Sequence, residues 1–210
     1  MNSVFVNRII RACKLDVSLY EEVESDQSAT LQAALVVVLS SIAAGIGAIS
    51  LGASNFLMAP ILSLVSWYIW AYLIYFIGAK LFPEVNTEAD HGQLLRTIGF
   101  SSAPGLIRIF GITPELMSIT FIGASIWMLV AMIIAVRQAL DYESTWRAIG
   151  VVVIGISTAV DAFFVDLALL FNFEIVFVVD GVRVLLIIIL AVVDVVVFFF
   201  VTLFFILFLS

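Results

Sequence analysis

The stretch "LLRTIGFSSAPGLIRIFG", residues 94–111, decides how this chain is arranged in a membrane. It is mostly apolar, yet its 18 residues include two arginines, three glycines and a proline. A helix needs about 20 residues to cross the hydrocarbon of a bilayer. The stretch therefore crosses only if Arg96 and Arg108 lie at its two ends, and the alternatives are a re-entrant segment or a loop.

The composition identifies the class of protein. Of the 210 residues, 64% are hydrophobic and 12% are charged, about half the charge density of a soluble domain. Such a chain cannot hide its apolar surface from water by folding alone, so it is predicted to be an integral membrane protein without a soluble domain. Cys13 is the single cysteine, which excludes an internal disulfide. No dense basic cluster favours nucleic acid as a partner.

Apolar runs of transmembrane length occur along the whole chain and predict an all-α, polytopic bundle of about six spans. The predicted spans cover residues 29–52, 57–82, 94–111, 116–140, 146–171 and 184–209.

The distribution of basic residues favours a third span that crosses. With six spans, seven basic residues fall on one side and two on the other. Without the third crossing, four basic residues fall on one side and five on the other. Because cytoplasmic loops are enriched in lysine and arginine, the N-terminus is predicted to be cytoplasmic. The seven are Arg8, Arg11, Lys14, Lys80, Arg96, Arg137 and Arg147, and the two are Arg108 and Arg183. Arg96 and Arg108 are then expected to extend to the two interfaces.

Residues 4–15 are predicted to form an amphipathic helix. Its apolar arc holds Phe5, Val6, Ile9, Ile10 and Cys13, and its polar arc holds Asn7, Arg8, Arg11 and Lys14. Such a helix either lies among the lipid headgroups or packs on the cytoplasmic ends of the bundle, and both alternatives remain open.

The third span contains a predicted helix break, formed by Ser101, Ser102, Ala103, Pro104 and Gly105. Proline removes a backbone N–H and disfavours helical geometry in the preceding residue. In lipid the freed groups need partners, so this span is expected to be central and enclosed. We favour a kinked packing helix over a broken helix that lines a substrate site, as in transporters.

Three quoted stretches resemble a known family. They are "RIIRACKLDVSLYEEVESDQSATLQA", "GQLLRTIGFSSAPGLIRIFGITPEL" and "IWMLVAMIIAVRQALDYESTWRAIGVVVIG". Together they resemble the Yip family of Ypt/Rab-interacting membrane proteins in its short bacterial form, over about residues 4–155. The resemblance implies a five-span helical bundle with a cytoplasmic N-terminus, in a bacterial inner membrane. Eukaryotic members are linked to small GTPases through a long N-terminal domain. Only about 28 residues precede the first span here, and "DVSLYEEV" does not match the family's tyrosine motif, so a small GTPase is not favoured as a partner.

With this resemblance the chain divides into three parts. Residues 1–28 are expected to form a cytoplasmic amphipathic segment, and residues 29–171 a Yip-like five-span bundle. Residues 172–210 depart from the family and add one apolar C-terminal helix, exposed to lipid or docked on a neighbour.

Small residues predict close helix packing. Ser40, Ala44, Ala48 and Gly52 recur every four residues in the first span, and Ala131, Ala135 and Ala139 repeat the pattern in the fourth.

Aromatic residues run through the middle of the second span: Trp67, Tyr68, Trp70, Tyr72 and Tyr75. Interface belts put such residues at span ends. Bulk packing, with the hydroxyls bonded inside the bundle, is favoured over a groove for a lipid tail, a quinone or a pigment.

Asp161, Asp166 and Asp194 fall inside predicted spans, where carboxylates are costly and are usually paired or functional. They could carry protons or hold a cation. Catalysis is not expected, because one histidine and one cysteine cannot form a metal cluster and His91 has no nucleophile motif beside it.

These patterns predict a non-catalytic scaffold or membrane-organising subunit without a cofactor, whose partners are membrane lipids and other integral membrane proteins. A narrower alternative is an accessory subunit of a large respiratory or photosynthetic complex. The other class is a small transporter or channel that uses the broken third span and the aspartates. A polar cavity reaching Pro104 would favour transport, and a tightly packed bundle would favour the scaffold.

Overall fold

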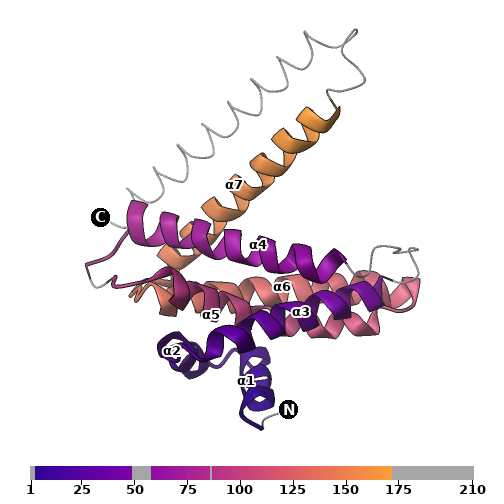
Figure 1. Ribbon diagram of the computed structural model, residues 1–210, viewed down its shortest axis with the longest axis horizontal. Helices are drawn as coiled ribbons and strands as arrows, with labels where there is room; N and C mark the ends of the chain where they lie inside the picture. The colour runs from indigo at the N-terminus through magenta and orange to yellow at the C-terminus, as the bar shows by residue number, and fades with distance from the viewer. Residues whose placement is uncertain (1–2, 49–57, 86, 172–210) are drawn as a thin grey trace. The chain divides into compact units, whose positions relative to one another are not determined.

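The computed structural model describes residues 3–48, 58–85 and 87–171, and within these ranges every regular element is a helix (Figure 1). This confirms the all-α class. The chain forms two compact units, Met1–Val152 and Val153–Ser210. The elements are α1 (Ser3–Cys13), α2 (Val17–Ser25), α3 (Ala29–Gly47), α4 (Met58–Tyr75), a π-helical turn η2 (Phe76–Leu81), α5 (His91–Ser101), a 3-10 helix η3 (Ala103–Phe110), α6 (Pro114–Ala139) and α7 (Thr145–Phe171).

Among the described residues, three helices are long and apolar enough to cross a membrane. They cover Ala29–Gly47, Pro60–Leu81 and Glu115–Ala139, and Thr145–Thr158 is a shorter apolar helix. The predicted count of six spans is therefore not confirmed. The sixth predicted span, residues 184–209, lies outside the described residues.

The third predicted span consists of α5 followed by η3, and it runs alongside α3 in the same direction. A Cβ atom on Gly99 would touch Ala33, one on Gly105 would overlap Ser40, and one on Gly47 would overlap the carbonyl group of Arg108. Residues later in α3 thus contact residues later in the third segment, so the two segments run parallel. The third segment therefore extends over the same depth as α3, which is itself a candidate span.

The sequence explains where α5 begins and ends. Asp90 and Gln93 form a capping box, in which each side chain accepts from the other residue's backbone N–H at the first turn. The α-helix stops at Ser101, and Pro104 then occupies the first turn of η3, where its missing N–H costs little. The Ser101 hydroxyl donates to the Ile98 carbonyl at 2.7 Å. The predicted break is thus a change from α to 3-10 geometry.

The N-terminal residues form two helices, of which only the first was predicted. Asp16 caps α2 by accepting from the Ser18 N–H at 3.0 Å, and Leu19, Tyr20 and Val23 are fully buried. The Asp16 cap and the apolar spacing of these three residues are the sequence signals for α2.

The buried face of α1 differs from the predicted apolar arc. Phe5, Arg8 and Ala12 are buried, whereas Val6 and Ile10 are exposed. Placing Arg8 on the polar, outward arc was therefore wrong. The reason is α2, whose Glu22 and Asp26 carboxylates each accept from Arg8 at 2.8 Å. The helix both packs on the bundle and keeps an exposed apolar strip.

Candidate functional site

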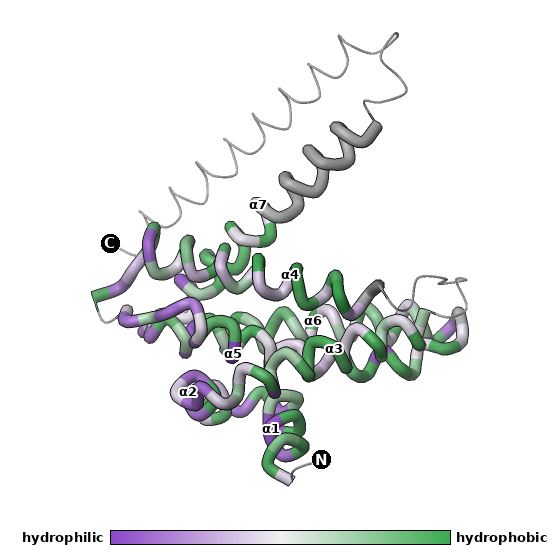
Figure 2. Tube along the Cα trace, in the orientation of Figure 1, coloured by the Kyte–Doolittle hydropathy of each residue, from purple (hydrophilic) through white to green (hydrophobic). Residues whose placement is uncertain are grey.

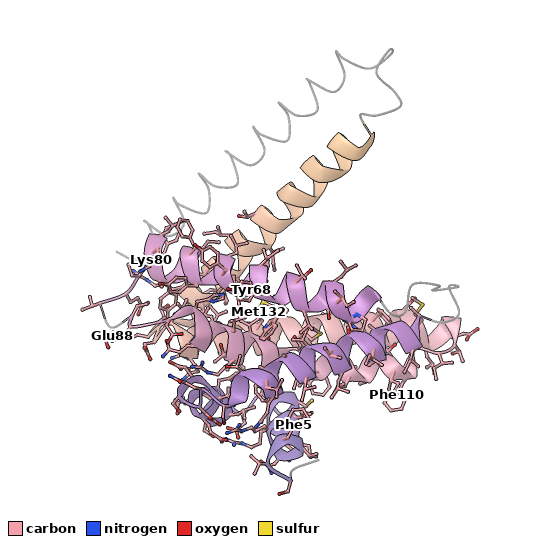
Figure 3. All side chains as sticks on the ribbon, in the orientation of Figure 1. Phe5, Tyr68, Lys80, Glu88, Phe110 and Met132 are labelled. Carbon is pink, nitrogen blue, oxygen red and sulfur yellow. The ribbon has the colours of Figure 1, made fainter. Side chains whose placement is uncertain are left out.

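The two ends of the bundle differ in polarity. The end that carries α2, the start of α3 and α5 and the finish of α6, which we call the α2 end, holds most of the hydrophilic residues (Figure 2). Lys80 and Glu88 lie toward this end and Phe110 toward the opposite end, which we call the η3 end (Figure 3). Several of the basic residues expected on one side lie at this end: Arg8, Arg11 and Arg96 bond to α2 or to its capping residues, Lys80 lies toward this end (Figure 3), and Arg137 is in the last turn of α6.

Arg96 connects the third segment to α2. Its side chain is buried, and its guanidinium donates to the carbonyl oxygens of Val23 at 2.9 Å and Glu24 at 3.1 Å. These are the last carbonyls of α2, which have no partner within that helix. The sequence predicted that Arg96 extends to a lipid interface, and the structure shows that it does not. It holds α2 on α5 from inside the protein.

A cavity of about 350 Å³ lies within the first unit, between α3, α4, α6 and the junction of α5 with η3. It has an open mouth and mainly apolar walls. The polar lining consists of five serines, two tryptophans and one arginine, and the lining residues include no acid. The serines are Ser40, Ser41, Ser63, Ser66 and Ser102, the tryptophans are Trp67 and Trp70, and the arginine is Arg108.

Arg108 faces this cavity with part of its hydrogen-bonding capacity unused. Its Nη2 atom donates to the Ser125 hydroxyl at 3.1 Å, and its guanidinium carbon lies 5.4 Å from the Phe121 ring centroid. Among the described residues its buried Nε atom has no hydrogen-bond partner. The sequence predicted that Arg108 extends to the membrane interface, and the structure places its half-buried side chain in the lining of the cavity, beside Ser125 and Phe121 of α6.

The aromatic residues of α4 divide between two faces. Trp67 and Trp70 line the cavity. The Trp67 Nε1 atom donates to the Leu95 carbonyl at 3.1 Å, whereas the buried Trp70 Nε1 atom has no hydrogen-bond partner among the described residues. The polar donor of Trp70 is therefore available to a molecule in the cavity.

The three tyrosines of α4 instead surround His91, the first residue of α5. Their ring centroids lie 4.9 Å (Tyr68), 5.6 Å (Tyr72) and 6.4 Å (Tyr75) from the His91 ring. Tyr68 and Tyr72 are more than half exposed, so they do not lie inside the bundle. The spacing of Tyr68, Tyr72 and Tyr75 places them on one face of α4, but nothing in the sequence indicates that His91 is their shared neighbour.

The structure describes some of the small residues that were predicted to pack helices closely. Ser40 is buried beside Gly105, Ala44 and Ala48 are half-buried, and Gly52 lies outside the described residues. Glycine allows close approach between α3 and the third segment at three points, where Ala33 faces Gly99, Ser40 faces Gly105 and Gly47 faces Arg108. Ala131, Ala135 and Ala139 of α6 are fully buried.

The structure does not describe the side chains of the three predicted intramembrane acids. Asp161 and Asp166 lie in the part of α7 after residue 158, where only the backbone is described, and Asp194 lies outside the described residues. Among the described residues, no group of histidine, cysteine, aspartate and glutamate has the arrangement of a metal site.

The family model described as Yip1 domain matches residues 18–165. The chain belongs to the Yip1 domain family. The match includes α2 to α6 and most of α7, and it therefore contains the cavity and the whole third segment. No curated protein and no solved structure matches the chain. The Yip1 domain and the apolar helices together identify a membrane protein and confirm the family resemblance.

Proposed function

We propose that this Yip1-domain protein is a non-catalytic scaffold that organises a membrane by binding other integral membrane proteins. The observation that carries the proposal is Gly123 on α6. A Cβ atom added there would meet nothing within 4 Å, and the neighbouring Ile119, Ile122 and Ile126 are exposed. Glycine inside a helix costs about 1 kcal/mol relative to alanine, and packing within the described bundle does not require it here.

In membranes, small residues allow a second helix to approach closely. A glycine on an otherwise bulky outer face therefore fits a contact with a transmembrane helix of another protein. The accessory subunit of a large respiratory or photosynthetic complex is a narrower form of the same proposal.

Gly123→Leu tests the scaffold at a position where an added Cβ atom meets none of the described residues within 4 Å. The matched control is Val65→Leu, which also enlarges an exposed residue, on α4. Membrane proteins that co-purify with wild type in mild detergent should be lost from Gly123→Leu and retained by the control. An identical set of partners for all three proteins would contradict the proposed contact.

A small transporter or channel is the second candidate, and the cavity favours it. The cavity reaches Ser102, two residues before Pro104, and Arg108 gives it a positive charge. Its walls are mainly apolar, which does not provide a continuous polar path. We therefore expect no ion or solute flux through the wild-type protein in liposomes.

The aspartates provide the decisive variant for this candidate. The triple variant Asp161→Asn, Asp166→Asn and Asp194→Asn should fold and keep its partners if the protein is a scaffold. A wild-type flux that disappears in this variant would instead establish a proton- or cation-coupled carrier.

We also propose that the α2 end is cytoplasmic and that the membrane is a bacterial inner membrane. The basic residues that bond to α2 or lie at the α2 end support this orientation, and they are Arg8, Arg11, Lys80, Arg96 and Arg137. In a Cys13→Ser background, single cysteines at the exposed positions Glu88 and Thr113 should be labelled from opposite sides. Labelling of both from one side would contradict the third crossing.

A further inference from the structure

We propose that the cavity beside η3 binds an anionic phospholipid, with the phosphate on Arg108 and part of one acyl chain extending toward Trp67. The proposal goes beyond the scaffold function and does not depend on which protein partner is bound.

A comparison of the hydrogen-bond partners of Arg108 with those of Arg8 and Arg96 indicates that the Arg108 guanidinium could bind an anion. Arg8 donates to Glu22, Asp26 and the amide oxygen of Gln32, and Arg96 is held by two backbone carbonyls. Arg108 has one neutral hydroxyl and a ring face as its described partners.

A cation removed from water is costly unless it is paired and its N–H groups are satisfied. The described lining of the cavity has no acid to provide the pair, and none of the described residues offers an acceptor to the buried Arg108 Nε donor. Phosphate oxygens satisfy a guanidinium well, because they accept two parallel N–H bonds.

The lining of the cavity is charged toward one end of the bundle and apolar toward the other, as the binding of an amphiphile requires. Gly47, at the η3 end of α3, touches the backbone of Arg108, whereas Trp67 bonds to Leu95 in the first half of α5. The charged group therefore belongs to the η3 end. Ile98, Trp67, Met128 and Met132 line the apolar remainder. Methionine side chains adapt to flexible apolar ligands.

The size and the opening favour part of a lipid. About 350 Å³ corresponds to roughly twelve water molecules at about 30 Å³ each, which holds a phosphate and a section of an acyl chain but not a whole phospholipid. The mouth is open. Because α3, α4 and α6 each contribute a wall and belong to candidate spans, the cavity lies at membrane depth, where lipid is the most abundant amphiphile.

The test uses the full-length protein in detergent and measures bound molecules by native mass spectrometry. Dioleoylphosphatidylglycerol is the probe, dioleoylglycerol has the same chains without the phosphate, and inorganic phosphate is the free anion. Arg108→Gln and Arg108→Lys change the cation. Ser66→Phe narrows the cavity and leaves Arg108 in place. Lys80→Gln, the loss of an exposed cation at the α2 end, is the control.

We expect wild type and Lys80→Gln to bind one phosphatidylglycerol in clear preference to dioleoylglycerol. Arg108→Gln should weaken that binding by about tenfold or more, as for loss of a charged hydrogen-bond partner. Arg108→Lys should lose less, and Ser66→Phe should reduce binding although Arg108 remains.

Three results would overturn the proposal. The first is equal binding of the two lipids to wild type, and the second is wild-type affinity in both Arg108→Gln and Ser66→Phe. The third is displacement of the lipid by inorganic phosphate, which would assign the site to a small anion. If Arg108→Gln does not fold, Ser66→Phe decides the second point alone.

Discussion

Gly99→Ala should destabilise the bundle although alanine is the better helix former. The Cβ atom would lie 2.6 Å from the Cβ atom of Ala33, whereas ordinary contact begins at 3.4 Å, a shortfall of about 0.8 Å. The Cα atom of Ala33, at 3.1 Å, is backbone and cannot rotate away. The two helices therefore have to separate.

The size of the effect follows from two opposing contributions. Replacing glycine by alanine inside a helix stabilises by about 1 kcal/mol. Overpacking at a close contact costs about 1–3 kcal/mol. Gly123→Ala receives the first contribution without the second, because nothing lies within 4 Å of its Cβ position. The two variants should thus differ by about 1–3 kcal/mol, with Gly99→Ala the less stable.

Thermal unfolding of both variants in the same detergent, at one scan rate, measures this difference. For a chain of this size, about 1 kcal/mol shifts the midpoint by about 2–4 °C, so a gap of about 2–12 °C is expected. If Gly99→Ala melts at or above the midpoint of Gly123→Ala, the close packing of α3 on α5 and the common direction of the two segments are both refuted.

Three further outcomes are expected. The pKa of Glu24 is raised from 4.5 to about 7 by burial and then by the nearby Asp141 carboxylate, so its protonated form is favoured in the fold. The stabilisation that the protonated Glu24 contributes is complete below about pH 4.5 and is lost as the pH rises through about 7. Asp141→Asn should therefore flatten the decline in melting midpoint between about pH 5 and 8. An unchanged pH profile would show that the Asp141 carboxylate does not raise the pKa of Glu24. Arg96→Gln should cost about 1–3 kcal/mol or more, because carbonyl groups at the end of α2 lose their donor, and chemical denaturation without a loss would show that α2 is held by other contacts. Pro104→Ala should keep the fold, whereas Gly105→Leu should lower the melting midpoint strongly because its side chain would overlap Ser40; equal midpoints would place the third segment against lipid.

The sequence predicted the features that depend on local chemistry. The apolar runs predicted helices because backbone groups in lipid must be satisfied within the segment. Ser-Ser-Ala-Pro-Gly located the break at the residue where α5 gives way to η3. The 3-10 geometry after the break could not be predicted from Pro104 alone, because proline is equally accepted in the first turn of an α-helix.

The features that were missed depend on neighbours distant in the sequence. The inward direction of Arg96 is explained by the carbonyls of α2, which lie more than 70 residues earlier. A long flexible side chain reaches either lipid headgroups or protein groups, and only the fold determines which are near. The ring cluster of His91 has the same cause, since the loop that follows α4 brings the histidine back to the tyrosines.

The change of helix type at Pro104 also sets the length of the third segment. A 3-10 helix rises about 2.0 Å per residue and an α-helix about 1.5 Å, so the eight residues of η3 extend about 4 Å further than an α-helix would. With the eleven residues of α5 and Ser102 between the two helices, the twenty residues of the segment reach about 34 Å, against about 30 Å for the hydrocarbon core of a bilayer. A continuous α-helix of the same twenty residues would reach about 30 Å. The change of helix type thus lengthens the third segment by about 4 Å, and for the crossing proposed above a return to α-geometry would fit the segment to a membrane thinner by that amount.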